Sequence, residues 1–157
     1  MRRSVLSFLL VTALPCGAAA QTVTPTDRPM QISPAFGVHF GTPMRSSLAL
    51  GILVDRSERT NDGMVFMLEP GQHGNEISAG YFRMLGRLGT GYSVRAAVLR
   101  TGDEPWNASP KTTYVGVEAH WMLIFGVGGR LGYLRRASRS VNDPHDNLAS
   151  VGVSIGG

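Results

Sequence analysis

The sequence has almost no cysteine and almost no lysine: Cys16 and Lys111 are the single examples among 157 residues. Cys16 lies inside a segment that looks like an export signal, so the exported chain would contain no cysteine. Disulfide bonds and thiol chemistry are then excluded. The chain has 15 basic and 11 acidic residues, and removing Arg2 and Arg3 with the signal leaves 13 against 11. These charges form no basic run, which excludes the electrostatic footprint of a nucleic-acid-binding protein.

The N-terminal segment predicts a cleaved signal peptide over residues 1–20. It has a positive start, a short apolar run and a small-residue cleavage site: Arg2 and Arg3, residues 5–14, and Ala18 to Ala20. The apolar run is too short to cross a membrane comfortably as a helix. Residues 21–34 are polar and contain three prolines, which predicts a flexible lead-in. Residues 35–157 then form one domain.

A long helical period is also absent. The stretch 114–134 is about as long and apolar as a membrane-spanning helix, yet it contains Glu118, His120, Arg130 and five glycines. A single helix would place these charges and helix-weakening glycines in hydrocarbon. Two strands explain the same residues better, because successive side chains of a strand point to opposite faces.

From residue 35 onward, short alternating runs are separated by Gly, Pro, Asn and Asp. They predict eight strands: 35–41, 47–55, 63–69, 75–85, 91–101, 112–123, 126–135 and 148–155. The connections 102–111 and 137–147 are long and polar. In an up-and-down sheet both lie at the same end. The predicted fold is all-β, a single eight-stranded antiparallel up-and-down β-barrel after a cleaved signal peptide.

The two faces of these strands differ in composition. One face is apolar on six of the predicted strands and carries, among others, Phe36, Val38, Leu50, Ile77, Val94, Val117 and Val151. The other is rich in Gly, Ala and Ser, with a few charges of both signs. Small residues suit a narrow lumen, since an eight-stranded barrel is just wide enough for side chains to fill. Buried charges must pair, which predicts a polar cluster in the lumen: Glu76, Arg95, Glu118, His120 and Arg130.

With this pattern, residues 35–157 resemble the small eight-stranded β-barrel proteins of bacterial outer membranes. The resemblance implies that the apolar face contacts lipid and that the two long loops lie outside the cell. Four aromatic residues would then lie at the membrane interfaces: Tyr81, Tyr92, Trp121 and Tyr133. We expect a monomer without metal or cofactor, with no enzymatic activity, acting structurally or through its outer loops. Candidate contact residues on those loops are Trp106, Arg139 and His145. The alternative for Trp106 is that it packs onto the barrel rim or lies among the lipid headgroups instead of binding a partner.

The chain departs from these proteins at its end, "VGVSIGG", because they commonly end in an aromatic residue. A soluble periplasmic barrel that binds a small apolar ligand inside therefore stays open. Such a barrel would need the opposite parity, with Val, Leu and Ile pointing inward.

Three local motifs bear on chemistry. The sequence "GVGGRLG" at 126–132 lacks the spacing of a phosphate loop and precedes no helical pattern. A lipid-modifying barrel enzyme is the second alternative, but no histidine starts a His-x-Ser pair, so a nucleophile would have to come from separate strands. The loop "NDPHDN" places Asp143 and Asp146 beside His145, where they could bind a divalent cation; turn-forming residues explain it more simply.

Overall fold

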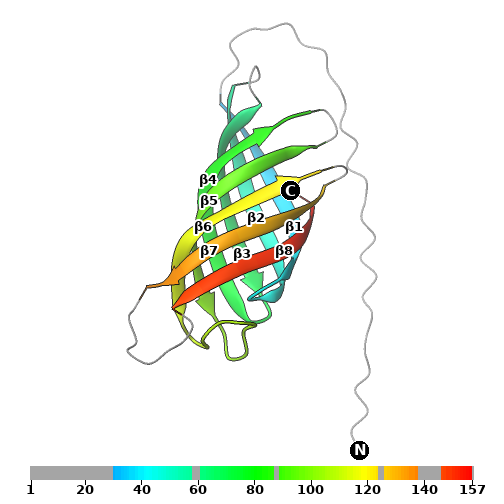
Figure 1. Cartoon of the computed structure of the whole chain (residues 1–157). Coiled ribbons are helices and arrows are strands. Elements are labelled where there is room, and N and C mark those ends of the chain that lie inside the picture. Colours follow the sequence, from blue (N-terminus) through cyan, green and yellow to red (C-terminus); the bar gives the residue numbers. More distant parts are fainter. Residues whose placement is uncertain (1–29, 58–60, 87–88, 124–125, 138–145, 157) are drawn as a thin grey trace, which may run out of the picture.

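The computed structural model describes residues 30–57, 61–86, 89–123, 126–137 and 146–156, which form eight strands closed into one barrel (Figure 1). The strands are β1 Gln31–Gly41, β2 Arg45–Ser57, β3 Asp62–Gly71, β4 Gly74–Met84, β5 Gly91–Thr101, β6 Thr113–Met122, β7 Val127–Arg136 and β8 Asn147–Gly156. Each strand pairs antiparallel with the next, and β8 pairs with β1 to close the sheet. The predicted all-β, up-and-down, eight-stranded barrel is confirmed. No helix of the described residues is long and apolar enough to cross a membrane.

The barrel has two unlike ends. We call the end that connects β5 to β6 and β7 to β8 the loop end. The end where β1 begins and β8 finishes is the terminal end (Figure 1). The two long connections therefore share one end, as the alternation of links predicted. The loop end also carries two tight turns, at 42–44 and 72–73.

The first strand begins at Gln31, four residues before the predicted start, so residues 31–34 belong to the barrel and not to a lead-in. Pro34 and its polar neighbours are not typical strand residues, so the sequence did not predict this extension of the strand. The register explains why a proline is accepted there. Strand β8 pairs with β1 only over 37–41, so Pro34 pairs with Ile52 of β2 in the part of β1 that has β2 alone as its neighbour. A missing N–H costs least at such an edge.

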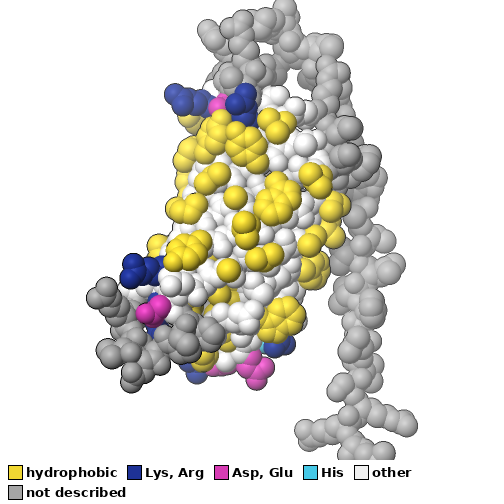
Figure 2. All heavy atoms as spheres, in the orientation of Figure 1, with side chains coloured by type: hydrophobic (Ala, Val, Ile, Leu, Met, Phe, Trp, Pro, Cys, Tyr) yellow, Lys and Arg dark blue, Asp and Glu magenta, His cyan; other side chains and the backbone are white. Residues whose placement is uncertain are grey.

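The outer surface of the barrel is apolar on all eight strands. Exposed side chains include Phe36, Leu50, Phe66, Ile77, Val94, Val117, Leu131 and Val151. Figure 2 shows such side chains spread across the middle of one face, with charged side chains near the two ends. Tyr81, Tyr92 and Trp121 form a cross-strand group near the terminal end, and Tyr133 lies toward the loop end. The predicted parity is the one observed.

The lumen is filled in three layers. An apolar cluster lies at the loop end and contains Met44, Ala97, Leu99, Ala108, Tyr114, Leu134 and Leu148. A second lies toward the terminal end and contains Ala35, Ala49, Val65, Met67 and Phe82, with Leu53 and Met84 against it. Ionisable side chains lie between the two clusters. The small and polar inward face that the sequence indicated is therefore only part of the lumen, which also holds large apolar side chains such as Phe82, Leu99 and Tyr114.

Candidate functional site

The middle layer of the lumen is built around Arg130, which is 1% exposed on β7. Its Nη1 lies 2.9 Å from an oxygen of Glu69, 3.9 Å from one of Glu76 and 4.0 Å from one of Glu118. All three glutamates are also buried. One guanidinium thus balances carboxylates from β3, β4 and β6, and it ties together strands that lie far apart around the barrel.

Glycine at position 132 makes room for one of these carboxylates. Gly132 lies directly opposite Glu118 in the pairing of β6 with β7. A Cβ at this position would lie 2.7 Å from Cγ of Glu118, closer than carbon atoms can approach. The Glu118 side chain therefore occupies the space that a side chain at 132 would need.

Two histidines flank the carboxylates. His120 Nε2 lies 3.1 Å from Oε2 of Glu118, and His39 Nδ1 lies against Oε1 of Glu69. Both rings are buried, and their centroids are 5.6 Å apart. Each imidazole is thus held by a carboxylate through one nitrogen, which leaves its second nitrogen for another contact.

The structure brings four of the five predicted lumen residues together: Glu76, Glu118, His120 and Arg130. Arg95 lies opposite Glu118 in the strand register, but its Nε donates to Ser93 Oγ at 2.9 Å. No ion pair involves Arg95 within the described part of the chain. Its side chain is half-buried.

Sequence reasoning missed Glu69 and did not assign His39 to the cluster. Glu69 lies near the end of a strand that is otherwise apolar on both faces, with Met64, Phe66 and Leu68 outward and Val65 and Met67 inward. The two faces of such a strand are equally hydrophobic, so the alternation of residue types does not show which face points into the lumen. Only the register of β3, which places Glu69 opposite Glu76, identifies Glu69 as a lumen residue.

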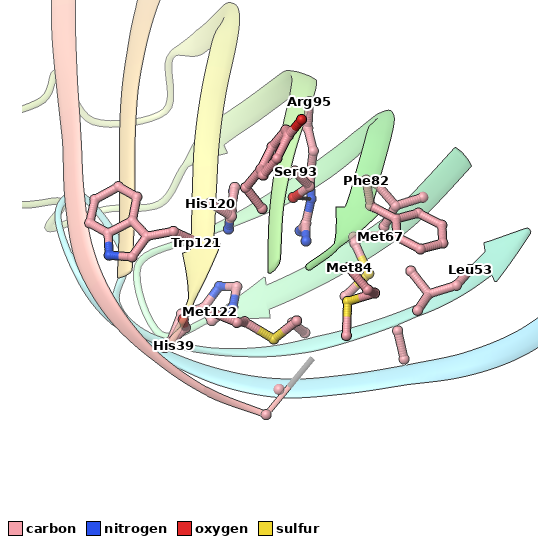
Figure 3. A pocket seen from close by; sticks show the side chains of 17 residues that line it. His39, Leu53, Met67, Phe82, Met84, Ser93, Arg95, His120, Trp121 and Met122 are labelled. Atoms are coloured by element: carbon pink, nitrogen blue, oxygen red, sulfur yellow. Dashed lines mark hydrogen bonds between the residues drawn. The ribbon is translucent and has the colours of Figure 1, made fainter. Parts of the chain in front are cut away.

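A cavity of about 50 Å³ lies between the charged layer and the terminal end (Figure 3). Apolar side chains form much of its wall: Leu53, Val65, Met67, Phe82, Met84 and Met122. Its polar side carries His39, Ser93, Arg95, His120 and Ser154. Figure 3 shows His39 and His120 on one side of this space, Met67 and Met84 on the other, and the Arg95 side chain between the two groups.

The loop end is closed by the connection between β5 and β6. Its backbone is hydrogen-bonded to two neighbouring turns: Gly102 N donates a hydrogen bond to the carbonyl of His73, and Trp106 N donates one to the carbonyl of Pro43. Ala108 and Ser109 are buried beneath the loop. This connection is therefore part of the packed barrel and not a free surface along its whole length.

The loop residue Trp106 packs onto the barrel rim. Its indole is 48% exposed, and the guanidinium carbon of Arg45 lies 5.1 Å from the ring centroid. The rim position that the sequence left as an alternative is the one observed. Arg139, Asp143 and His145 lie outside the described residues.

Tyr114 holds this loop from inside the barrel, which gives a testable prediction. Its hydroxyl accepts a hydrogen bond of 3.0 Å from Ser109 N, and both residues are buried. We expect Tyr114→Phe to lower the free energy of unfolding by about 1–3 kcal/mol, because the buried N–H loses this partner. Chemical unfolding of the folded barrel measures the change. Thr113→Val on the same strand serves as a control, and an equal loss in both variants would contradict this role for Tyr114.

No group of three or more His, Cys, Asp or Glu side chains that could hold a metal ion occurs among the described residues. The loop that carries Asp143, His145 and Asp146 falls mostly outside them. Among the hydrogen bonds between described residues, none joins a serine hydroxyl to either lumen histidine. The contacts of Arg130 join β3, β4, β6 and β7, and the cavity lies beside this layer. No family model, curated protein or solved structure matches this chain.

Proposed function

We propose that this protein is a non-enzymatic β-barrel of a bacterial outer membrane, a monomer that acts structurally or through its loop end. The supporting observation is the continuous apolar outer surface. Soluble monomers rarely expose apolar patches larger than a few hundred Å², whereas a membrane barrel places its apolar face against lipid. The predicted export signal at 1–20 agrees with this location but lies outside the described residues.

The distribution of outward charges supports the same proposal. Arg56 and Arg83 lie near the terminal end, and Arg100 and Arg135 lie near the loop end. Between these rows, no outward-facing strand residue in the described part of the chain is charged. An uncharged belt bounded by arginines matches the depth dependence of charge in a bilayer, where arginine is costly at the midplane and tolerated at the interfaces.

Fractionation with a heat-modifiability gel tests this proposal. The expected result is sedimentation with outer-membrane vesicles and a folded form that migrates differently before and after boiling. Release of the protein with the soluble periplasmic fraction would contradict it. A soluble periplasmic barrel is the less favoured alternative, because its parity would be the opposite of that observed.

A lipid-modifying enzyme is a second candidate, and one observation favours it. Ser93 lies directly opposite His120, whose Nε2 contacts Glu118. The Ser93 hydroxyl, however, accepts a hydrogen bond from Arg95. We expect the acyl composition of lipid A to be the same with and without the protein. A difference that Ser93→Ala removes would establish the enzyme and contradict the non-enzymatic proposal.

The packed lumen gives a further prediction about conductance. Two apolar clusters and the charged layer fill the bore, and the β5–β6 connection closes the loop end. We expect no steady porin-like channels when the purified barrel is added to planar lipid bilayers. An established porin in the same bilayer serves as the positive control. Reproducible channels from the barrel itself would show that the packed layers open, in contradiction to this prediction.

The interaction role is best tested without deleting loops. Removing the β5–β6 connection would uncover buried Leu99 and Tyr114 and destabilise the barrel. Substitution of exposed groups on that connection avoids this problem: Glu104→Ala, Trp106→Ala and Lys111→Ala together. If this variant restores every phenotype lost in a strain without the protein, the exposed groups of this loop are not needed. That result would contradict a recognition role for the loop.

A further inference from the structure

Three of the seven methionines in the sequence line the cavity described above. Met84 and Met122 are the two nearest the terminal end, and Met67 lies on the wall formed by β3. Thioether sulfur is a soft ligand that selects Cu(I) among biological metals, and imidazole also binds copper. Both lumen histidines, His39 and His120, line the same cavity.

The strand register explains how these side chains come together. Met84, Gly91, Met122, Gly128, Ser154 and His39 are successive cross-strand neighbours around the barrel wall. Small residues thus separate the three long ones and leave room for them to lean inward. A Cβ on Gly91 would lie 2.9 Å from Sδ of Met84, so the thioether occupies the space over this glycine. His120 lies two residues before Met122 on the same face.

The two imidazoles have the support that metal-binding histidines usually have. A ligating histidine commonly donates its other ring N–H to a carboxylate, which fixes the orientation of the ring. His39 has Glu69 in this position, and His120 has Glu118. With a metal–nitrogen distance of about 2.0–2.1 Å, two rings on one ion have centroids about 5–6 Å apart. The observed separation is 5.6 Å.

The ligand types of the cavity, and not the charge of the layer, select a soft monovalent ion. Glu69, Glu76 and Glu118 lie within 4.0 Å of the Arg130 guanidinium, and Arg95 lies on the cavity wall. Because a nearby positive charge opposes the binding of a cation, the affinity of the site for a positive ion depends on Arg95.

From these observations we propose that His39, His120, Met84 and Met122 form a site for a soft monovalent metal ion, Cu(I) or its redox-inert analogue Ag(I). Figure 3 shows the four side chains around the cavity, with Arg95 beside them. This proposal does not depend on the membrane location, since it concerns the interior of the barrel.

The test is competition between the purified, folded barrel and bicinchoninate for Cu(I), under ascorbate and without oxygen. One ion per barrel is expected. Met84→Leu and Met122→Leu should each weaken binding by about ten-fold or more, the factor that corresponds to 1.4 kcal/mol. Leucine nearly conserves the volume of methionine, so the barrel should keep its heat-modifiable migration. Met64→Leu is the matched control, because Met64 lies on the outward face of β3 and is 46% exposed.

Arg95→Gln separates a metal site from a site for small anions. Removing this positive charge should tighten Cu(I) binding by roughly three- to ten-fold. A carboxylate ligand such as hexanoate, measured by calorimetry, would instead lose affinity in this variant. The proposal is overturned if the barrel takes up no Cu(I), if the two inward methionine variants bind as the parent does, or if hexanoate binds and Cu(I) does not.

Discussion

Replacing Arg130 by methionine is expected to lower the free energy of unfolding by about 3–5 kcal/mol, because it removes a buried partner from carboxylates that stay buried. The guanidinium lies within 4.0 Å of three glutamates, all of them inaccessible to solvent. Urea unfolding of the barrel in lipid vesicles, followed by tryptophan fluorescence, measures the loss.

Arg135→Met is the matched control for this experiment. Arg135 lies on the same strand but its side chain points outward and is exposed. Exposed substitutions of this kind usually change stability by no more than about 0.5 kcal/mol. Equal losses in the two variants would contradict a buried network held by Arg130.

The choice of partner within the network can be tested separately. The sequence predicted Glu118 as a member of the cluster, but the shortest contact of Arg130 is with Glu69. Nη1 of Arg130 lies 2.9 Å from an oxygen of Glu69 and 4.0 Å from one of Glu118. A double-mutant cycle of Arg130→Met with Glu69→Gln should therefore give a larger coupling energy than one with Glu118→Gln. Contacting residues in one network couple by about 0.5–3 kcal/mol.

Placing arginine at Val117 should impair insertion and cost roughly 2–4 kcal/mol, the penalty for arginine at the bilayer midplane. Val117 lies in the middle of β6, is 54% exposed, and has Ala96 and Tyr133 as outward neighbours in the sheet. The yield of heat-modifiable barrel after folding into vesicles measures the effect.

The control for Val117→Arg is Glu104→Arg, at an exposed position of the loop end. Ser109, which also belongs to this loop, is unsuitable because it is buried. Its carbonyl accepts a 2.6 Å hydrogen bond from the hydroxyl of Thr101. If arginine at 117 and at 104 were tolerated equally, the outer surface would not face lipid.

The alternation of residue types was sufficient to predict the strands and their parity. Val115, Val117 and Ala119 alternate with Gly116, Glu118 and His120 on β6, and all six point as expected. Alternation failed where both faces are alike, as on β3, and there Glu69 was missed. It also failed at Pro34, where the edge position of the residue depends on how far β8 extends along β1.

The packing of the loop end could not be predicted from local patterns. The burial of Ser109 and the hydrogen bond between its N–H and Tyr114 depend on how the β5–β6 connection folds back over the rim. Polar composition alone indicated an exposed loop, because it records no contact between distant residues. The common position of His39, Met84 and Met122 on the cavity wall was missed for the same reason, since the three residues come from β1, β4 and β6, no two of which are adjacent.

The two tryptophans allow a direct measurement of whether the apolar surface contacts lipid. Trp106→Phe leaves only Trp121, on the outward face near the terminal end, and Trp121→Phe leaves only Trp106, on the loop. Each variant is folded with vesicles whose acyl chains carry bromine, which quenches tryptophan on contact. We predict strong quenching of Trp121 and clearly weaker quenching of Trp106 by bromine placed along the chain. Unquenched Trp121 in a folded barrel that stays in the supernatant would contradict a membrane-spanning barrel.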